Sequence, residues 1–347
     1  MRTAVVALML LAACGSDDPY GQPDAATGDA TAIDAAGRCG DGVVGSPEQC
    51  DGTALAGATC GSRGFDVGVL ACRSDCSFDE TSCKDLAWIT VPPIGITVPA
   101  TFTMGSPTTE LCRFAVSEDQ HAVTLTRRFE MAKYETTQAE FLAVMGYAPS
   151  NFTGCPTCPV ENLTWHEAVA YTNALSSGQA LASCYTCTGS GPSVICAVAS
   201  AYAGKQIYAC PGYRLPTGAE FELATRASTT DAFYSGPITS CQSMGHLDAT
   251  AWYNEPTAGT HPVGGKLANP WGLHDIVGNV FEWCHDWWTT AVNAETDPAG
   301  PATGSTRVLR GGAFGTAADY LRSARRYGFD PALRQLNFGV RPVRTLP

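Results

Sequence analysis

The cysteines of this chain limit its possible folds more than any other residue type. Sixteen of them occur in 347 residues. A cytosolic protein of this length rarely carries so many, because the cytosol keeps thiols reduced and unpaired. We therefore expect an oxidising compartment and several disulfides. The 36 glycines and 22 prolines add the expectation of many turns and long loops.

The first 14 residues are typical of a secretion signal. Arg2 supplies a positive start, and the apolar run Ala4–Ala13 is too short to span a bilayer. LAAC, ending at Cys14, resembles a bacterial lipobox, in which the cysteine becomes the first mature residue and carries lipid. The alternative is an ordinary signal with an incidental cysteine. We expect lipidation of Cys14, because it ends the apolar run, and hence an exported protein anchored to a bacterial membrane, periplasmic or at the cell surface.

Residues 15–37 have the composition of a tether. They are Asp, Ala, Gly and Thr with almost no large apolar side chains. Such a segment cannot bury a core, so we expect it to be disordered.

Residues 38–84 form a region that we expect to be a small disulfide module. A unit this short buries little apolar surface, so cross-links must supply much of its stability. Its six cysteines allow fifteen pairings, and the sequence does not choose among them. A zinc site is the rival interpretation, which irregular spacing and the lack of histidine disfavour. CGDGVV and FDVGVLACRSDC resemble Cys-rich repeats of myxobacterial and related secreted proteins, which implies a spacer or adhesion unit.

Three helix starts organise residues 86–347, the expected main domain. At each start a threonine is followed three residues later by a glutamate, the spacing of a capping box. The first helix should end near Gly146, and residues 121–126 alternate as a strand does. Irregular spans separate these elements, so the pattern predicts a mixed, loop-rich domain. The three pairs are Thr137 with Glu140, Thr164 with Glu167, and Thr217 with Glu220.

The stretch from Trp271 to Pro342 mixes tryptophan, glycine, acids and arginines in a way that suits a compact, irregular core. Its segments GNVFEW, RVLRGGAF, RSARR and NFGVRPV resemble the formylglycine-generating enzyme family of sulfatase-modifying factors. Upstream, FTMGS, HAVTLT, YETTQAEF and YRLPTGAEFELATRA resemble the same family. The resemblance extends over residues 100–345. It implies an α+β fold, a loop-rich and disulfide-stabilised variant of the C-type lectin fold.

The main domain carries nine cysteines, so at least one is unpaired or pairs with another chain. We expect Cys284 to be free, because it follows apolar core residues and free cysteines are often buried. Cys155 and Cys158 form a CxxC, which in an exported chain favours a structural staple over redox work. The other expected pairs are Cys184–Cys210, Cys187–Cys196 and Cys112–Cys241.

The resemblance implies an oxidase that converts a substrate cysteine to an aldehyde with oxygen. In that family two cysteines just after an Arg-Gly-Gly motif hold Cu(I), an ion that prefers soft thiolates. The motif here lies at 310–312, and Thr316 and Leu321 stand where the cysteines belong. The span 313–347 contains neither Cys nor Met. We therefore expect no copper and no formylglycine formation by the family's route.

A second branch of the family oxidises sulfur compounds with non-haem iron held by a His-rich motif in an added helical domain. The six histidines of this chain include no H-x-x-x-H pair, and no such domain is present. A site of two histidines and a carboxylate would need His246 and His285 to meet near the core. The sequence disfavours it.

The resemblance also implies a structural calcium ion. Its ligands in the family are a side-chain oxygen, two main-chain carbonyls and a carboxylate, hard donors that suit Ca²⁺. They map onto Asp275, Gly278, Val280 and Glu282. The alternative is that the two acids only pair with nearby arginines: Arg322, Arg325 and Arg326.

The formal net charge of −12 argues against a nucleic-acid partner, because phosphate binding needs clustered lysine and arginine. No G-x-S-x-G or H-E-x-x-H motif indicates a secreted hydrolase. We expect a lipid-anchored, non-catalytic binding or scaffold protein whose exposed Trp, Tyr and Arg loops hold a peptide, glycan or small-molecule ligand. The alternative is a divergent oxidoreductase or protein-modifying enzyme of the same family, because the family signature is nearly complete.

Overall fold

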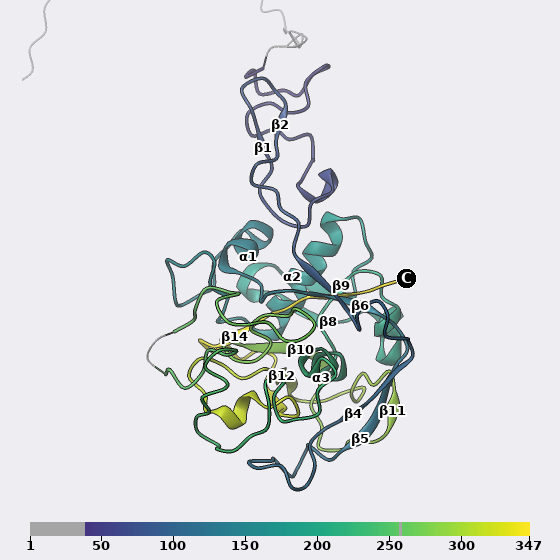
Figure 1. Ribbon diagram of the computed structural model, residues 1–347. Helices are drawn as coiled ribbons and strands as arrows, with labels where there is room; N and C mark the ends of the chain where they lie inside the picture. The colour runs from purple at the N-terminus through teal and green to yellow at the C-terminus, as the bar shows by residue number, and fades with distance from the viewer. Residues whose placement is uncertain (1–38, 257–258) are drawn as a thin grey trace, which may run out of the picture.

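The computed structural model describes residues 39–256 and 259–347. A small Cys-rich module, ending near residue 84, projects from the end of the main domain that carries α1 and α2 (Figure 1). The expected signal and tether, with Cys14, lie outside the described residues. In the part of the chain that is described, no helix has the length and apolar character needed to cross a bilayer.

Three α-helices begin where the sequence predicts. At each start the threonine hydroxyl accepts the N–H of the glutamate three residues on, and the glutamate side chain accepts the N–H of the threonine. Both donors, which the helix itself leaves unpaired, are thereby satisfied. Gly146 ends the first helix in the left-handed conformation that glycine adopts without steric cost. The helices are α1 (Gln138–Met145), α2 (Trp165–Gly178) and α3 (Gly218–Arg226).

Short strands pair into five small sheets in the described residues. The expected strand at 121–126 is confirmed as β5. In order within each sheet, the strands are β1 (Ala71–Cys72) and β2 (Phe78–Asp79); β3 (Trp88–Val91), β6 (Phe129–Ala132), β15 (Val343–Thr345) and β9 (Tyr213–Arg214); β11 (Glu295–Thr296), β5 (His121–Leu125) and β4 (Ala100–Met104); β13 (Tyr327–Phe329), β12 (Arg307–Arg310), β10 (Phe281–Trp287) and β14 (Phe338–Gly339); β7 (Tyr185–Thr188) and β8 (Ile195–Val198). The 3₁₀ helices are η1 (Gly61–Arg63), η2 (Gly191–Ser193), η3 (Ser200–Tyr202), η4 (Gly204–Ala209) and η5 (Ala318–Leu321).

Two buried tryptophans join the start of α2 to β10 at the centre of the domain. Trp165 Nε1 donates to the carbonyl of Cys284 at 2.9 Å, and Trp283 Nε1 donates to the carbonyl of Leu163 at 3.0 Å. Each indole thus satisfies its single polar group inside an apolar core.

Seven disulfides cross-link the described residues. Within the main domain the predicted pairs are confirmed, and Cys284 is the free, buried cysteine of the described chain. The module's pairing, which the sequence left open, follows from the structure. The bridges are Cys112–Cys241, Cys155–Cys158, Cys184–Cys210 and Cys187–Cys196 in the domain, and Cys39–Cys76, Cys50–Cys72 and Cys60–Cys83 in the module.

A single carboxylate fastens the module to the main domain. Asp66 Oδ2 accepts the backbone N–H of Leu86 at 2.8 Å and the indole N–H of Trp88 at 2.9 Å. Asp66 Oδ1 accepts the hydroxyl of Tyr213 at 3.0 Å and also the side-chain amide of Gln179. Donors from separate segments of the domain therefore converge on one side chain of the module, which is docked rather than merely tethered.

We expect Asp66→Ala to undock the module without unfolding it. The module keeps its own disulfides, whereas about 2 kcal/mol of charge-assisted hydrogen bonding between the two parts is lost. Limited proteolysis should then cleave near Lys84 much faster than in the parent protein. Asp75→Ala, which removes bonds only to Ser77 inside the module, is the control. Equal cleavage of both variants would contradict the role of Asp66.

Candidate functional site

The family's copper position lies in the turn after β12. Gly311 and Gly312 have φ values of +91° and +77°, and a Cβ on Gly312 would lie 2.6 Å from Cδ1 of Leu321. Glycine is therefore required at position 312. The carbonyl of Gly311 accepts the N–H of Gly278 at 2.9 Å, which joins this turn to the expected calcium segment.

Neither side chain at the two cysteine positions offers a soft donor. The Thr316 hydroxyl donates to the carbonyl of Ala313 at 2.8 Å and accepts its N–H at 3.0 Å. Leu321 is fully buried in a second apolar cluster that includes Val277 and Ala318. Thr316 thus stabilises the turn, and Leu321 packs in the core.

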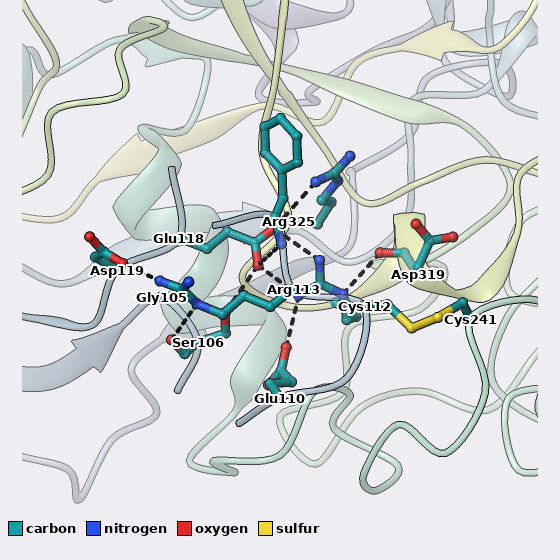
Figure 2. Close-up of polar contacts among 12 residues, drawn as sticks. Gly105, Ser106, Glu110, Cys112, Arg113, Glu118, Asp119, Cys241, Asp319 and Arg325 are labelled. Carbon is teal, nitrogen blue, oxygen red and sulfur yellow. Dashed lines mark hydrogen bonds and ion pairs between the residues drawn. A yellow bond between two sulfur atoms is a disulfide. The ribbon is translucent and has the colours of Figure 1, made fainter. Parts of the chain in front are cut away.

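A buried ion pair holds the loop of residues 105–119 against this turn (Figure 2). Arg322 Nη1 donates to Glu118 Oε2 at 2.7 Å and to Glu110 Oε1 at 2.8 Å, and Arg322 Nη2 donates to Glu118 Oε1 at 3.0 Å. The side chains of Arg322 and Glu118 are both fully buried. Glu118 also accepts the hydroxyl of Ser106 at 3.0 Å, so its carboxylate is bonded to both sides of the contact.

The same loop is fixed at two further points. Gly105 donates its N–H to Glu222 at 2.8 Å and accepts from Arg226 at 2.7 Å, which anchors the start of the loop to α3. The disulfide Cys112–Cys241 anchors its middle (Figure 2). The loop is therefore held in one conformation although it contains no strand or helix of its own.

An exposed aromatic surface with a cation at its centre lies where this loop meets the chain after η5. The Arg325 guanidinium lies 4.2 Å from the ring centroid of Phe114 and 4.5 Å from that of Tyr327. Tyr327 in turn stacks on Tyr320 at 5.3 Å. Phe114 and Tyr320 remain 38% and 37% exposed. We call Phe114, Tyr320, Arg325 and Tyr327 the Phe114–Arg325 surface; the Arg325 side chain is itself only 11% exposed, and its Nη1 lies 3.7 Å from Glu118 Oε1. Leu111 and Val116 of the same loop are also exposed.

The expected calcium segment contains a cluster of buried carboxylates. Both oxygens of Glu282 accept from Arg341, at 2.9 and 3.0 Å from Nε. Glu135, from the chain before α1, accepts the N–H of Val280 at 3.0 Å. Asp275 Oδ2 accepts the N–H of Gly264 at 2.6 Å. The arginine that pairs with Glu282 is therefore Arg341 and none of the three in the RSARR segment.

Negative charge exceeds positive charge in this cluster. Glu135, Asp275 and Glu282 are all buried, and Arg341 is the guanidinium among them. Burial, followed by the charges of Asp275 and Glu282, raises the pKa of Glu135 well above its ordinary value. Burial likewise raises the pKa of Asp275. Asp275 Oδ1 is buried and has no hydrogen-bond partner in the described structure, so this oxygen is free to accept a cation.

Position 278 requires glycine because of its backbone conformation and the close approach of a neighbouring segment. Its φ is +88°, and a Cβ there would lie 2.4 Å from the carbonyl oxygen of Trp252. The segment that begins at Asp275 therefore crosses the Trp252 backbone at a distance that excludes any side chain.

The histidines do not form a metal site together. His246 packs on Phe233 in the second apolar cluster, and His285 bonds Tyr185 in the main core. Among the described His, Cys, Asp and Glu side chains, one group of three has ligand atoms that all lie within 4.8 Å of one another, Cys39 with Asp51 and Cys76. Its two cysteines are joined in a disulfide. Glu135, Asp275 and Glu282 do not form such a group.

Sequence reasoning missed Glu135 and Arg341. Glu135 lies in the segment YETTQAEF and Arg341 in NFGVRPV, and both segments carried the family resemblance. An acid and an arginine inside such motifs are a usable signal. Charged side chains are seldom fully buried unless they are paired, so both residues were candidates for a buried ion pair.

Comparisons with known proteins agree with this architecture. The family described as "Sulfatase-modifying factor enzyme 1-like domain" matches residues 91–346. The chaperone protein LppX of Paenibacillus barcinonensis is 30% identical over 246 residues, which cover 62% of this chain and 80% of LppX. The formylglycine-generating enzyme of Thermomonospora curvata is 30% identical over 182 residues, which cover 48% of this chain and 47% of the enzyme. The chain thus spans about half of that enzyme's length.

Two solved structures share the fold. Treponema denticola variable protein 1 superimposes with a TM-score of 0.61 at 28% identity, over 75% of this chain and 95% of its own. PvdO from Pseudomonas aeruginosa superimposes with a TM-score of 0.58 at 20% identity, over 81% of this chain and 99% of its own. The expected α+β, C-type-lectin-like fold is thereby confirmed.

We expect Glu118→Gln to cost about 3 kcal/mol of stability, because it leaves Arg322 with less charge compensation in a buried site. The double variant Glu118→Gln/Arg322→Met removes the cation as well and should recover part of the loss. Urea unfolding of Glu118→Gln, Arg322→Met and the double variant measures this. Additive effects of the two substitutions would show that they do not form one unit.

We expect the free energy of unfolding to fall as the pH rises from about 5 to 8 in the presence of a chelator. Carboxyls whose pKa is raised by folding, here Glu135 and Asp275, hold their protons more tightly in the folded chain. The stability they provide is complete at acidic pH and is lost as the pH passes through the raised pKa. Glu135→Gln should flatten this dependence. An equal slope in that variant would assign it to other groups.

Proposed function

Since the chain belongs to the sulfatase-modifying factor enzyme 1-like family, we propose that it uses this family's fold to bind an apolar, aromatic peptide segment of another exported protein, without oxidising a cysteine. The Phe114–Arg325 surface carries this proposal. Exposed aromatic rings around a guanidinium are the side chains that dominate binding energy at protein interfaces.

The Phe114–Arg325 surface is preorganised for binding. Glu118, Arg322 and the disulfide Cys112–Cys241 fix the loop that presents Phe114. A rigid loop loses little conformational entropy on association, so more of the contact energy remains as affinity. A relative described as a chaperone protein, LppX, supports a role in holding other polypeptides.

Thiol chemistry is a poor match for this site. Cys284 is the free cysteine of the described chain, and burial raises its pKa well above the ordinary value, so it is held as a thiol. The thiolate is the form that ligates soft metals and attacks substrates. Thr316 and Leu321 leave the family's copper position without a thiol.

The export route and the anchor complete the proposal. The disulfides indicate an oxidising compartment. We infer that lipid on Cys14 holds the protein at a bacterial membrane, with residues 15–37 as tether and the docked module as a spacer. The module would then keep the main domain away from the lipid surface.

Calcium is the cofactor that the buried carboxylates favour. Asp275, Glu282 and the carbonyls of Gly278 and Val280 would hold it, and the ion would supply the positive charge that the cluster lacks. Its role is structural, because the segment that it would stabilise is the one bonded to the Gly311 turn.

A second candidate function is a divergent protein-modifying or oxidising enzyme, which the 30% identity to a formylglycine-generating enzyme favours. It requires a redox metal. The metal measurement below separates the two functions.

We expect the purified protein to retain a stoichiometric amount of calcium after calcium, copper and iron are offered in turn, as measured by elemental analysis. Asp275→Asn should lose most of it, and calcium should cancel the loss of stability at higher pH. Tight retention of copper or iron would favour the enzyme.

We expect Phe114→Ala/Tyr320→Ala to weaken peptide binding about tenfold or more, since removing two central aromatic contacts costs about 2 kcal/mol. The probe is an array of extended peptides that vary in aromatic content. The control is Val69→Ala, an apolar residue of the module that is 59% exposed. The proposal fails if the parent protein selects no peptide from the array, or if the double variant binds as the parent does.

A further inference from the structure

A cavity of about 270 Å³ lies between the start of α3 and the chain after β10. The start of α3 at Gly218 and Ala219 contributes backbone groups to its lining, and Met104 contributes an apolar wall. The titratable side chains of the lining are His121, Asp286, Glu295 and Arg326. The volume is near the lower end of the range for small-molecule sites, so the cavity suits a compact molecule and not a peptide chain.

Arg326 is the unusual member of this lining. It is only 8% exposed, yet it makes no hydrogen bond or ion pair with any residue that the structure describes. Its buried Nε has no partner. Burial and then the neighbouring charge of Arg310 lower the pKa of Arg326. Burying a guanidinium without a directly bonded anion is unfavourable.

Arg307 is also buried without a carboxylate partner, but its guanidinium packs on the rings of Trp165 and Trp287 and donates to the carbonyl of His285. Four other buried arginines differ from Arg326. Each is bonded to a carboxylate of the domain itself. The pairs are Arg214 with Glu220, Arg310 with Glu222, Arg322 with Glu118 and Arg341 with Glu282. Arg326 therefore faces the cavity with an unused charge.

The carboxylates near Arg326 are already engaged. Glu222 is held between Arg226 and Arg310 at 2.8 and 2.7 Å. Asp286 Oδ2 accepts the N–H of Gly218 at 2.5 Å, so this acid caps the start of α3. The anion that completes Arg326 must then come from outside the chain.

The groups around the cavity define the class of that anion. A guanidinium binds a carboxylate through two parallel hydrogen bonds, and the nine-residue helix α3 adds partial positive charge at its N-terminus. Asp286 places a negative charge on the same lining, whereas the other carboxylate there, Glu295, is paired with Lys205 at 2.9 Å. Asp286 would repel a multiply charged anion but would attract a hydrogen-bond donor or a cation on the same ligand.

We propose that this cavity binds a small α-amino or α-hydroxy acid, with the carboxylate on Arg326 and the amino or hydroxyl group on Asp286. The apolar wall at Met104 would receive a short side chain. The lining of this cavity shares no residue with the Phe114–Arg325 surface. The inference therefore does not rest on the proposed function.

Titration calorimetry and thermal unfolding of the full-length mature protein test this inference with L-alanine, L-lactate, acetate and inorganic phosphate. We expect alanine or lactate to bind and to raise the melting temperature. Acetate, which lacks the donor, and phosphate, which carries more charge, should bind about tenfold more weakly or not at all. Tightest binding of phosphate, or no binding of any of the four, would overturn the proposal.

Two variants and a control test the roles of Arg326 and Asp286 in binding. Arg326→Gln should weaken binding about tenfold or more and should not lower the melting temperature in the absence of ligand, because it removes an unpaired charge. Asp286→Asn keeps an acceptor for Gly218 and should abolish the preference for alanine over acetate. If Arg326→Gln does not accumulate, Asp286→Asn carries the test alone. Arg334→Gln, which removes an ion pair with Glu167, should bind as the parent does; unchanged binding by Arg326→Gln would refute the proposal.

Discussion

Buried guanidinium–carboxylate pairing is the interaction on which the rest of this structure depends. The main domain has three short α-helices and sheets of two to four strands, so backbone hydrogen bonding alone leaves much of the chain undirected. Arg341 and Glu282 join residues 59 apart in sequence, and Arg322 and Glu118 join residues 204 apart. Such pairs need not add net stability, because desolvation offsets their attraction. They do penalise every arrangement in which one partner is buried alone, and this selects a single path for the loops.

The same logic explains how an irregular chain can present surfaces of defined shape. The loop with Phe114 is anchored by Glu118, by Gly105 and by Cys112, and each anchor acts on a different part of it. Arg326, in contrast, forms no ion pair with any residue that the structure describes, so its charge is available to a ligand.

Local rules predicted a large part of the fold. The capping boxes at Thr137, Thr164 and Thr217 involve groups three residues apart, and the sequence displays them directly. The expected disulfides of the main domain are confirmed, and Cys284 is the free cysteine, as its place after apolar core residues predicted. The ion pairs were not predictable in this way. The partner of Glu282 is Arg341, which lies between β14 and β15, and Glu135 comes from the chain before α1. Neither the Phe114–Arg325 surface nor the cavity at Arg326 has a spacing signature, since each combines segments that meet only after the domain has closed.

The place of β15 in its sheet has a consequence for biosynthesis. This strand lies between β6 and β9 and pairs with both, so the sheet that closes the domain is incomplete until residue 345 has left the ribosome and crossed the export channel. Contacts of such long sequence separation form late and slowly. Most of the arginines and acids that end up buried must therefore wait in water, in an unfolded and export-competent chain, before their partners arrive. For an exported protein this order is useful, because premature folding would obstruct passage through a narrow channel.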